Sequence, residues 1–119
     1  MDEDELAEVL GRLVEAGALD DERFARRFAE DKRELRGWGP ERIAQALSGR
    51  GLPDFLIASA LAPDSREDQL RRASVLLAGR WASLATDVER NRALRFLTRR
   101  GYDYEIAYEV IRAASRDAA

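Results

Sequence analysis

A pattern that returns after fifty residues constrains the fold of this chain more than any other feature. Residues 42–51 and 92–101 share four identities at matched positions. These are Arg42, Leu47, Arg50 and Gly51 in the first copy, and Arg92, Leu97, Arg100 and Gly101 in the second. Each copy is typical of a helix that ends at a glycine and is followed by a turn and a second apolar helix. One such unit cannot bury its own apolar face, so the pattern predicts a modular helical interaction protein.

Composition supports helices and argues against an enzyme. The 119 residues are 45% hydrophobic and 36% charged, with Ala, Leu, Glu and Arg dominant, and these are good helix formers. The chain has no cysteine and no histidine. It therefore lacks a thiol nucleophile, the commonest general base near neutral pH and the commonest metal ligand. We expect no catalytic, cofactor or metal site.

Charge is distributed unevenly along the chain. Residues 1–30 carry ten acidic and four basic side chains, whereas residues 31–119 carry thirteen acidic and sixteen basic ones. Nineteen of the twenty cations are arginine, which favours bidentate contacts to carboxylate or phosphate, although an arginine-rich proteome explains this equally well. No apolar run reaches the roughly 20 residues that span a bilayer, and the acidic start is unlike a signal peptide. These features predict a cytoplasmic protein without a membrane contact.

Glycine and proline divide the chain into about seven predicted helices, which makes the fold all-α. The first helix is expected near residues 4–16, with Gly17 as its C-cap, and the second from Asp20 to the Gly37-Trp38-Gly39-Pro40 break. The remaining helices are expected near 40–50, 53–62, 65–81, 86–100 and from 103 onward. Capping is predicted at Asp20, Ser65, Thr86 and Asp103, and Pro40 is predicted as the first residue of its helix.

The aromatic residues divide into two sets. Helical spacing predicts a core role for Phe24, Phe28, Phe55, Phe96 and Trp81. For Tyr102, Tyr104 and Tyr108 the pattern leaves open whether one of them anchors a partner.

Two segments then carry a resemblance to a known family. Residues 19–26 (LDDERFAR), followed by residues 36–43 (RGWGPERI), resemble the central signature of RecX proteins. Residues 97–102 (LTRRGY) are similar to the C-terminal repeat of that family. The resemblance covers essentially the whole chain, in order and with sensible spacing.

The resemblance implies a bacterial regulator of the RecA recombinase, built from tandem three-helix repeats that form an elongated, curved helical array. Such proteins bind the RecA filament on single-stranded DNA and inhibit its ATPase and strand exchange, with no catalysis of their own. The expected units are residues 1–18, as the last helix of a truncated first repeat, then 19–62 and 63–119 as the second and third repeats. A basic first repeat is usual in the family, so the acidic start indicates a shortened chain or a naturally short form. We expect a monomer that contacts RecA and single-stranded DNA within or beside the filament.

Two cationic groups are candidate contact sites for RecA or DNA. The first comprises Lys32, Arg33, Arg36 and Arg42 beside Trp38, around a glycine-rich turn where they are expected to converge on one edge. The second comprises Arg90, Arg92, Arg95, Arg99 and Arg100, of which Arg92, Arg95 and Arg99 share one helix face. For both groups the alternative is an ordinary solvated surface, with Trp38 packed between helices.

A direct DNA-binding helix-turn-helix-like protein is the alternative function. The pairs 40–61 and 90–112 have the required form of two helices joined by a tight glycine turn. Their second helices argue against it, because residues 53–62 carry only Asp54 and residues 103–111 carry Asp103, Glu105 and Glu109. A recognition helix offers Arg, Lys, Asn or Gln to base edges.

Overall fold

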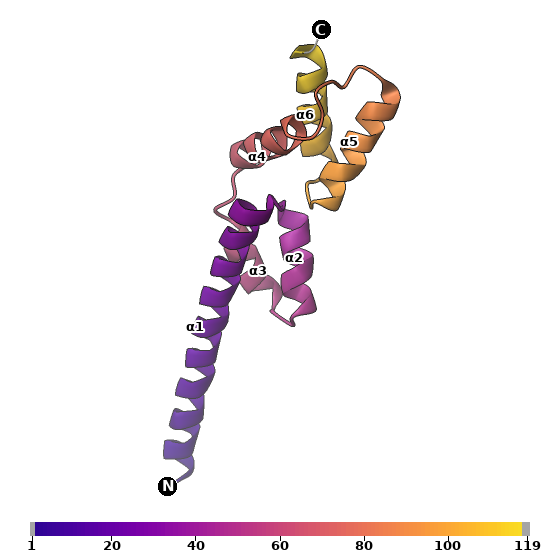
Figure 1. Ribbon diagram of the computed structural model, residues 1–119. Helices are drawn as coiled ribbons and strands as arrows, with labels where there is room; N and C mark the ends of the chain where they lie inside the picture. The colour runs from indigo at the N-terminus through magenta and orange to yellow at the C-terminus, as the bar shows by residue number, and fades with distance from the viewer. Residues whose placement is uncertain (1, 118–119) are drawn as a thin grey trace.

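The computed structural model describes the chain from Asp2 to Asp117. This part folds into six helices without a strand and is a rod of 75 × 20 × 19 Å, in agreement with the predicted all-α repeat fold (Figure 1). The helices are α1 (Glu3–Arg36), α2 (Pro40–Gly49), α3 (Asp54–Leu61), α4 (Arg66–Ala78), α5 (Asp87–Arg99) and α6 (Tyr104–Asp117).

The first two predicted helices are one continuous helix, so the predicted break at Gly17 is wrong. Residues 17–20 are helical, and Gly17 is not among the glycines with positive φ. A mid-helix glycine costs only about 1 kcal/mol, and the helix formers on both sides outweigh that cost. Asp20 is consequently not an N-cap; Asp2 caps the helix by accepting a hydrogen bond from the Glu5 N–H at 2.7 Å.

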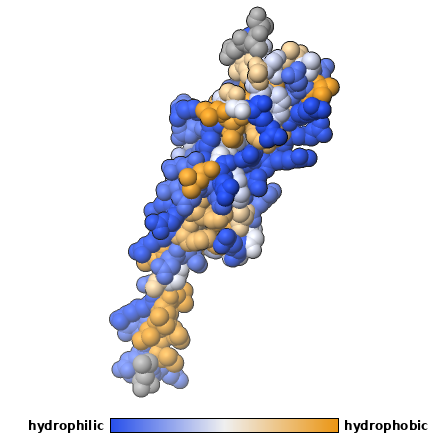
Figure 2. All heavy atoms as spheres, viewed as in Figure 1, coloured by the Kyte–Doolittle hydropathy of each residue, from blue (hydrophilic) through white to orange (hydrophobic). Residues whose placement is uncertain are grey.

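The first half of α1 extends beyond the other helices, as Figure 1 shows. Its apolar side chains Leu6, Leu10 and Leu13 are 48%, 51% and 63% exposed. Figure 2 shows hydrophobic residues gathered on the lower part of the rod. Across residues 2–117, none of the helices combines the length and hydropathy needed to cross a membrane.

Two groups of three helices each surround a separate core. The second half of α1 packs with α2 and α3 around Ala25, Ala29, Ile43, Leu47, Ile57 and Ala60. Helices α4, α5 and α6 pack around a larger set, namely Ala73, Leu77, Leu84, Ala93, Leu97, Tyr102, Ile106, Ala107, Val110 and Ile111. Small alanines in both cores allow the helices to approach closely, while leucine and isoleucine fill the remaining space.

The sequence repeat is confirmed as a structural repeat. Leu47 and Leu97 are fully buried, and each carbonyl accepts a hydrogen bond from the N–H five residues later, at 3.3 and 3.2 Å. Within these two turns, Gly51 and Gly101 have φ values of 86° and 101°. Glycine enters this region without a penalty because it has no Cβ. The two turns therefore have the same geometry and the same glycine requirement.

The caps predicted for the later helices are confirmed. Thr86 and Glu89 form a complete capping box at the start of α5, Ser65 accepts from the Asp68 N–H, and Asp103 accepts from the Ile106 N–H. Pro40 is the first residue of α2.

The predicted aromatic core is only partly correct. Phe28, Trp81 and Phe96 are half-buried, whereas Phe24 is 40% and Phe55 is 69% exposed. Phe55 faces solvent because α3 buries Leu56 and Ile57, and a helix of eight residues buries only one narrow face.

Candidate functional site

The two helix groups meet where the start of α2 lies against the end of α5. The Gly39 N–H donates to the carbonyl of Arg100 at 2.8 Å, and the Glu41 N–H donates to the carbonyl of Gly101 at 3.0 Å. The first N–H groups and the last carbonyls of a helix have no hydrogen-bond partner within it. Here the free N–H groups at the start of α2 donate to free carbonyls at the end of α5. The positive N-terminus of α2 also faces the negative C-terminus of α5. We call this region the joint.

Two arginine side chains strengthen the joint by donating to backbone carbonyls of the opposite group. Arg42 of α2 donates to the carbonyl of Arg99 at 3.3 Å, and Arg100 donates to the carbonyl of Arg36 at 2.9 Å. Carbonyls at the ends of α1 and α5 thus receive charged donors, which is favourable at a helix C-terminus.

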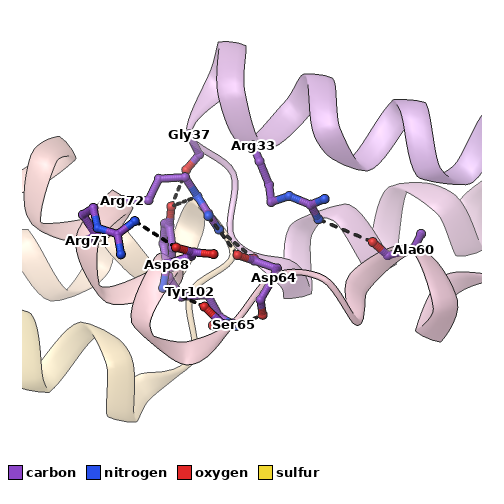
Figure 3. Close-up of polar contacts among 10 residues, drawn as sticks. Arg33, Gly37, Ala60, Asp64, Ser65, Asp68, Arg71, Arg72 and Tyr102 are labelled. Atoms are coloured by element: carbon purple, nitrogen blue, oxygen red, sulfur yellow. Dashed lines mark hydrogen bonds and ion pairs between the residues drawn. The ribbon is translucent and has the colours of Figure 1, made fainter.

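A largely buried polar network, drawn in Figure 3, links Arg72 of α4 and Tyr102 to Gly37 at the end of α1. The hydroxyl of Tyr102, which is fully buried, donates to the carbonyl of Gly37 at 2.8 Å and accepts from Nε of Arg72 at 2.9 Å. Arg72 also donates to both carboxylate oxygens of Asp64, at 3.0 and 2.8 Å. The Asp64 side chain is only 1% exposed, so this bidentate pair satisfies a charge that would otherwise be costly to bury.

Burial also sets the protonation of the network. It raises the pKa of Tyr102, because a buried phenolate loses its hydration, and the positive charge of Arg72 offsets only part of that effect. Burial lowers the pKa of Arg72, but the hydrogen bond to Asp64 and the neighbouring charges outweigh burial and leave that pKa raised. At neutral pH Tyr102 is therefore a neutral donor and Arg72 a cation.

The main surface feature beside the joint is a hollow of about 520 Å³ lined by arginines. We call it the arginine hollow; it is lined by Arg42, Arg80, Arg92, Arg95, Arg99 and Arg100, with Trp81 and Phe96. No acidic side chain is in this lining. Five of these arginines come from the turn after α4, from α5 and from the residue that follows α5, and Arg42 of α2 completes the lining from the other side of the joint.

Three of these arginines rest on aromatic rings. The guanidinium of Arg42 lies 4.3 Å from the centre of the Trp38 ring, and those of Arg80 and Arg100 lie 4.9 and 5.0 Å from that of Phe96. A cation over an aromatic face is attracted by the ring quadrupole, which holds these side chains in place.

The other three arginines have no such support. Within residues 2–116, the side chains of Arg92, Arg95 and Arg99 form no ion pair or hydrogen bond and are exposed. Like charges three and four residues apart on a helix repel by roughly 0.2–0.5 kcal/mol per pair. An anionic ligand would relieve this repulsion.

The first predicted cationic group converges only in part. Lys32 and Arg42 both lie over Trp38, at 4.8 and 4.3 Å, and Trp38 packs edge-on against Phe28. Arg33 instead points to α3, where it donates to the carbonyl of Ala60 (Figure 3).

Of that first group, only Arg42 lines the hollow. Arg36 is exposed, and its carbonyl is what contacts the opposite helix group. The helical rotation of about 100° per residue separates Arg33 from Lys32, which explains the divergence.

Sequence reasoning missed Arg80 and the Tyr102 network. Arg80 follows the end of α4, and nothing in its neighbours indicates that it meets Phe96. An aspartate directly after a helix-ending proline, such as Asp64 after Pro63, is common in exposed turns. The neighbouring residues therefore gave no indication that Asp64 would be buried. Of the three tyrosines left open, Tyr102 is buried, whereas Tyr104 and Tyr108 stack on the surface with ring centres 5.8 Å apart.

Fold and site together define a helical-repeat protein with an arginine-lined hollow beside the joint between its two helix groups. The comparisons with known proteins agree with this class. Residues 20–61 match the family description "RecX, second three-helix domain". The chain is 38% identical over 112 residues to the regulatory protein RecX of Halorhodospira halophila, covering 92% of this chain and 68% of that protein. It is 33% identical to that of Thermus thermophilus, covering 97% and 74%.

Two further comparisons bear on length and shape. The regulatory protein RecX of Mycobacterium sp. strain JLS is 33% identical over 117 residues, and the chain spans 64% of its length. The crystal structure of RecX from Lactobacillus salivarius superposes with a TM-score of 0.76 at 22% identity, covering 97% of this chain and 77% of that one. The chain belongs to the RecX family.

Proposed function

We propose that this chain binds the RecA filament on single-stranded DNA and inhibits its ATPase and strand exchange. Its family membership supports a regulatory role, since the relatives carry the name regulatory protein RecX. The observation that carries the proposal is the arginine hollow, an exposed cationic surface without a carboxylate in its lining. Such a surface complements the acidic side chains of a protein filament or the phosphates of the DNA within it.

The shape of the chain suits this role. A rod of 75 × 20 × 19 Å presents a long surface that can lie along a filament and contact neighbouring subunits. We propose that residues 19–62 and 63–119 act as two three-helix units of that rod, with the joint fixing their relative orientation. No chemistry by the chain itself is needed for inhibition, and its place of action is the cytoplasm, where the recombinase and DNA lie.

Direct binding to duplex DNA by a helix-turn-helix is less well supported. The exposed residues in the first half of α6 are Tyr104, Glu105, Tyr108 and Glu109, and α3 carries only the charge of Asp54. Acidic side chains on the second helix of the motif would repel the phosphates that flank a major groove.

The proposal is tested by sedimentation with preformed filaments. RecA filaments are assembled on single-stranded DNA with a slowly hydrolysed ATP analogue and pelleted with increasing amounts of the chain. We expect the chain to enter the pellet saturably, and to stay in solution when RecA is omitted. A chain that remains in the supernatant with filaments present would refute the proposal.

A further inference from the structure

We propose that a groove between α5 and α6 binds an unpaired nucleotide, with the base stacked on a tyrosine ring and the phosphate held by an arginine. The groove has a volume of about 580 Å³, which is in the range of small-molecule sites. The two helices that form it pack side by side at the C-terminal end of the rod (Figure 1). We call it the tyrosine groove, and its defining lining residues are Arg90, Leu94, Tyr104, Tyr108, Arg112 and Arg116.

The tyrosine groove is separate from the arginine hollow. In the described part of the chain the two have no lining residue in common. Leu94 lines the groove whereas Arg95 and Arg99 line the hollow, because a rotation of about 100° per residue turns them to different sides of α5. The groove is therefore a second surface. Binding there is expected in the isolated chain, without the filament contact proposed above.

Two exposed tyrosines provide a stacking surface in the groove. Tyr104 and Tyr108 are 60% and 48% exposed, and their rings stack with centres 5.8 Å apart and planes 15° apart. One turn further along α6, the guanidinium of Arg112 lies 5.9 Å from the centre of the Tyr108 ring. These contacts hold the rings in a row before any ligand binds. Every nucleobase has a planar π-face that can stack on such rings.

The positive charge of the groove that is available to a ligand comes from α6. Arg90 of α5 is already engaged, since it donates to the carbonyl of Leu84 at 2.9 Å and forms an ion pair with Asp87. Arg112 and Arg116 are exposed and lie one helical turn apart. A guanidinium fork can bind two oxygens of one phosphate.

The order of these groups along α6 matches the order of the parts of a nucleotide. One turn, about 5.4 Å, separates Tyr108 from Arg112. The sugar of a nucleotide bridges a gap of this size, so a base on the tyrosines places its phosphate beside Arg112. An acidic peptide would meet the same arginines, but it would leave the flat faces of the rings without a flat partner. The rings therefore favour a nucleotide.

The test measures the binding of fluorescently labelled strands to the isolated chain by anisotropy, at about 50 mM salt. One probe is an oligo-dT of about 15 nucleotides, and the other is an abasic strand of the same length, which keeps the phosphates and lacks the bases. The groove variant is Tyr104→Ala with Tyr108→Ala. The conservative variant, Tyr104→Phe with Tyr108→Phe, keeps both rings. The matched control is Phe55→Ala, which removes a 69% exposed ring from α3. Thermal unfolding verifies that all three variants fold.

We expect the unaltered chain to bind oligo-dT roughly tenfold more tightly than the abasic strand, because only oligo-dT can stack. The groove variant should lose most of this preference, whereas the conservative variant and the control should keep it. A preference that requires both rings and survives their change to phenylalanine would support stacking at the groove.

Thymidine monophosphate, added as an unlabelled competitor, distinguishes the two sources of such a ligand. Displacement of oligo-dT from the groove would support a site for free nucleotides, and persistence of the preference would support a site for nucleotides within a strand. Absence of binding, equal binding of the two strands by the unaltered chain, or a preference unchanged in the folded groove variant would overturn the proposal. An acidic peptide would then be the better occupant, and none of these results depends on what the chain does to RecA.

Discussion

The backbone of Gly39 lies directly against the backbone of Gly101: a Cβ atom on Gly39 would stand 2.5 Å from the carbonyl oxygen of Gly101. This contact brings the start of α2 within hydrogen-bonding distance of the end of α5. No side chain fits between the two residues, so the joint depends on both positions remaining glycine.

The two repeated glycines provide an internal comparison for the joint. Gly51 and Gly101 share a positive φ, but a Cβ on Gly51 meets nothing within 4 Å, whereas one on Gly101 would lie 2.5 Å from the backbone nitrogen of Arg42. We expect Gly51→Ala to lower the free energy of unfolding by about 1–2 kcal/mol through backbone strain alone. Gly101→Ala should cost about 1–3 kcal/mol more, because the helix ends must separate. Urea unfolding measures both, and equal losses would argue against a tight joint.

Tyr102 is expected to stabilise the joint through its hydroxyl. Tyr102→Phe keeps the buried ring but leaves Nε of Arg72 and the carbonyl of Gly37 without this partner. We predict a loss of about 1–3 kcal/mol in unfolding free energy, the usual cost of unsatisfied buried polar groups. Tyr104→Phe is the control, since that ring is 60% exposed and its change should stay within about 0.5 kcal/mol. Similar effects of the two substitutions would show that the network contributes little.

Stability is expected to fall at alkaline pH because of the same residue. The pKa of Tyr102 is raised above its ordinary value of 10.0 in the folded chain. Unfolded chains then lose the phenolic proton at lower pH than folded ones, so the contribution of Tyr102 is complete below pH 10 and declines as pH rises through the folded pKa. Urea unfolding between about pH 9 and 11 should show this decline, and Tyr102→Phe should make it shallower. An identical pH profile in the variant would contradict this assignment.

Charge reversal on α5 should separate binding from folding. The triple variant Arg92→Glu, Arg95→Glu and Arg99→Glu changes three exposed side chains that have no ion-pair partner in the described part of the chain. The three substitutions should change the free energy of unfolding by less than about 1 kcal/mol, since exposed charges contribute little to stability. The apparent affinity for RecA filaments, measured by sedimentation, should fall at least roughly tenfold. A folded triple variant that still binds filaments normally would show that these arginines do not contact the filament.

Local signals in the sequence were enough to predict most of the fold. The helix ends at Gly51 and Gly101, the capping box of Thr86 with Glu89 and the start of α2 at Pro40 each depend on a few adjacent residues. Gly17 was misjudged because a glycine ends a helix only where the chain also turns, and its neighbours keep α1 helical.

The site was less predictable because its members are distant in sequence. Arg42 and Arg99 are 57 residues apart, and Tyr102 and Gly37 are 65 apart. The helical period placed Arg92, Arg95 and Arg99 on one exposed face, as predicted. It carried no information on Arg80 joining them, because that depends on how α4 packs beside α5.

The most direct test of the account is RecA's ATP hydrolysis on single-stranded DNA, measured with increasing amounts of this chain and of the triple charge-reversal variant. The account predicts dose-dependent inhibition by the unaltered chain, and inhibition by the variant only at concentrations at least roughly ten times higher. Hydrolysis that is unaffected by the folded, unaltered chain would contradict it.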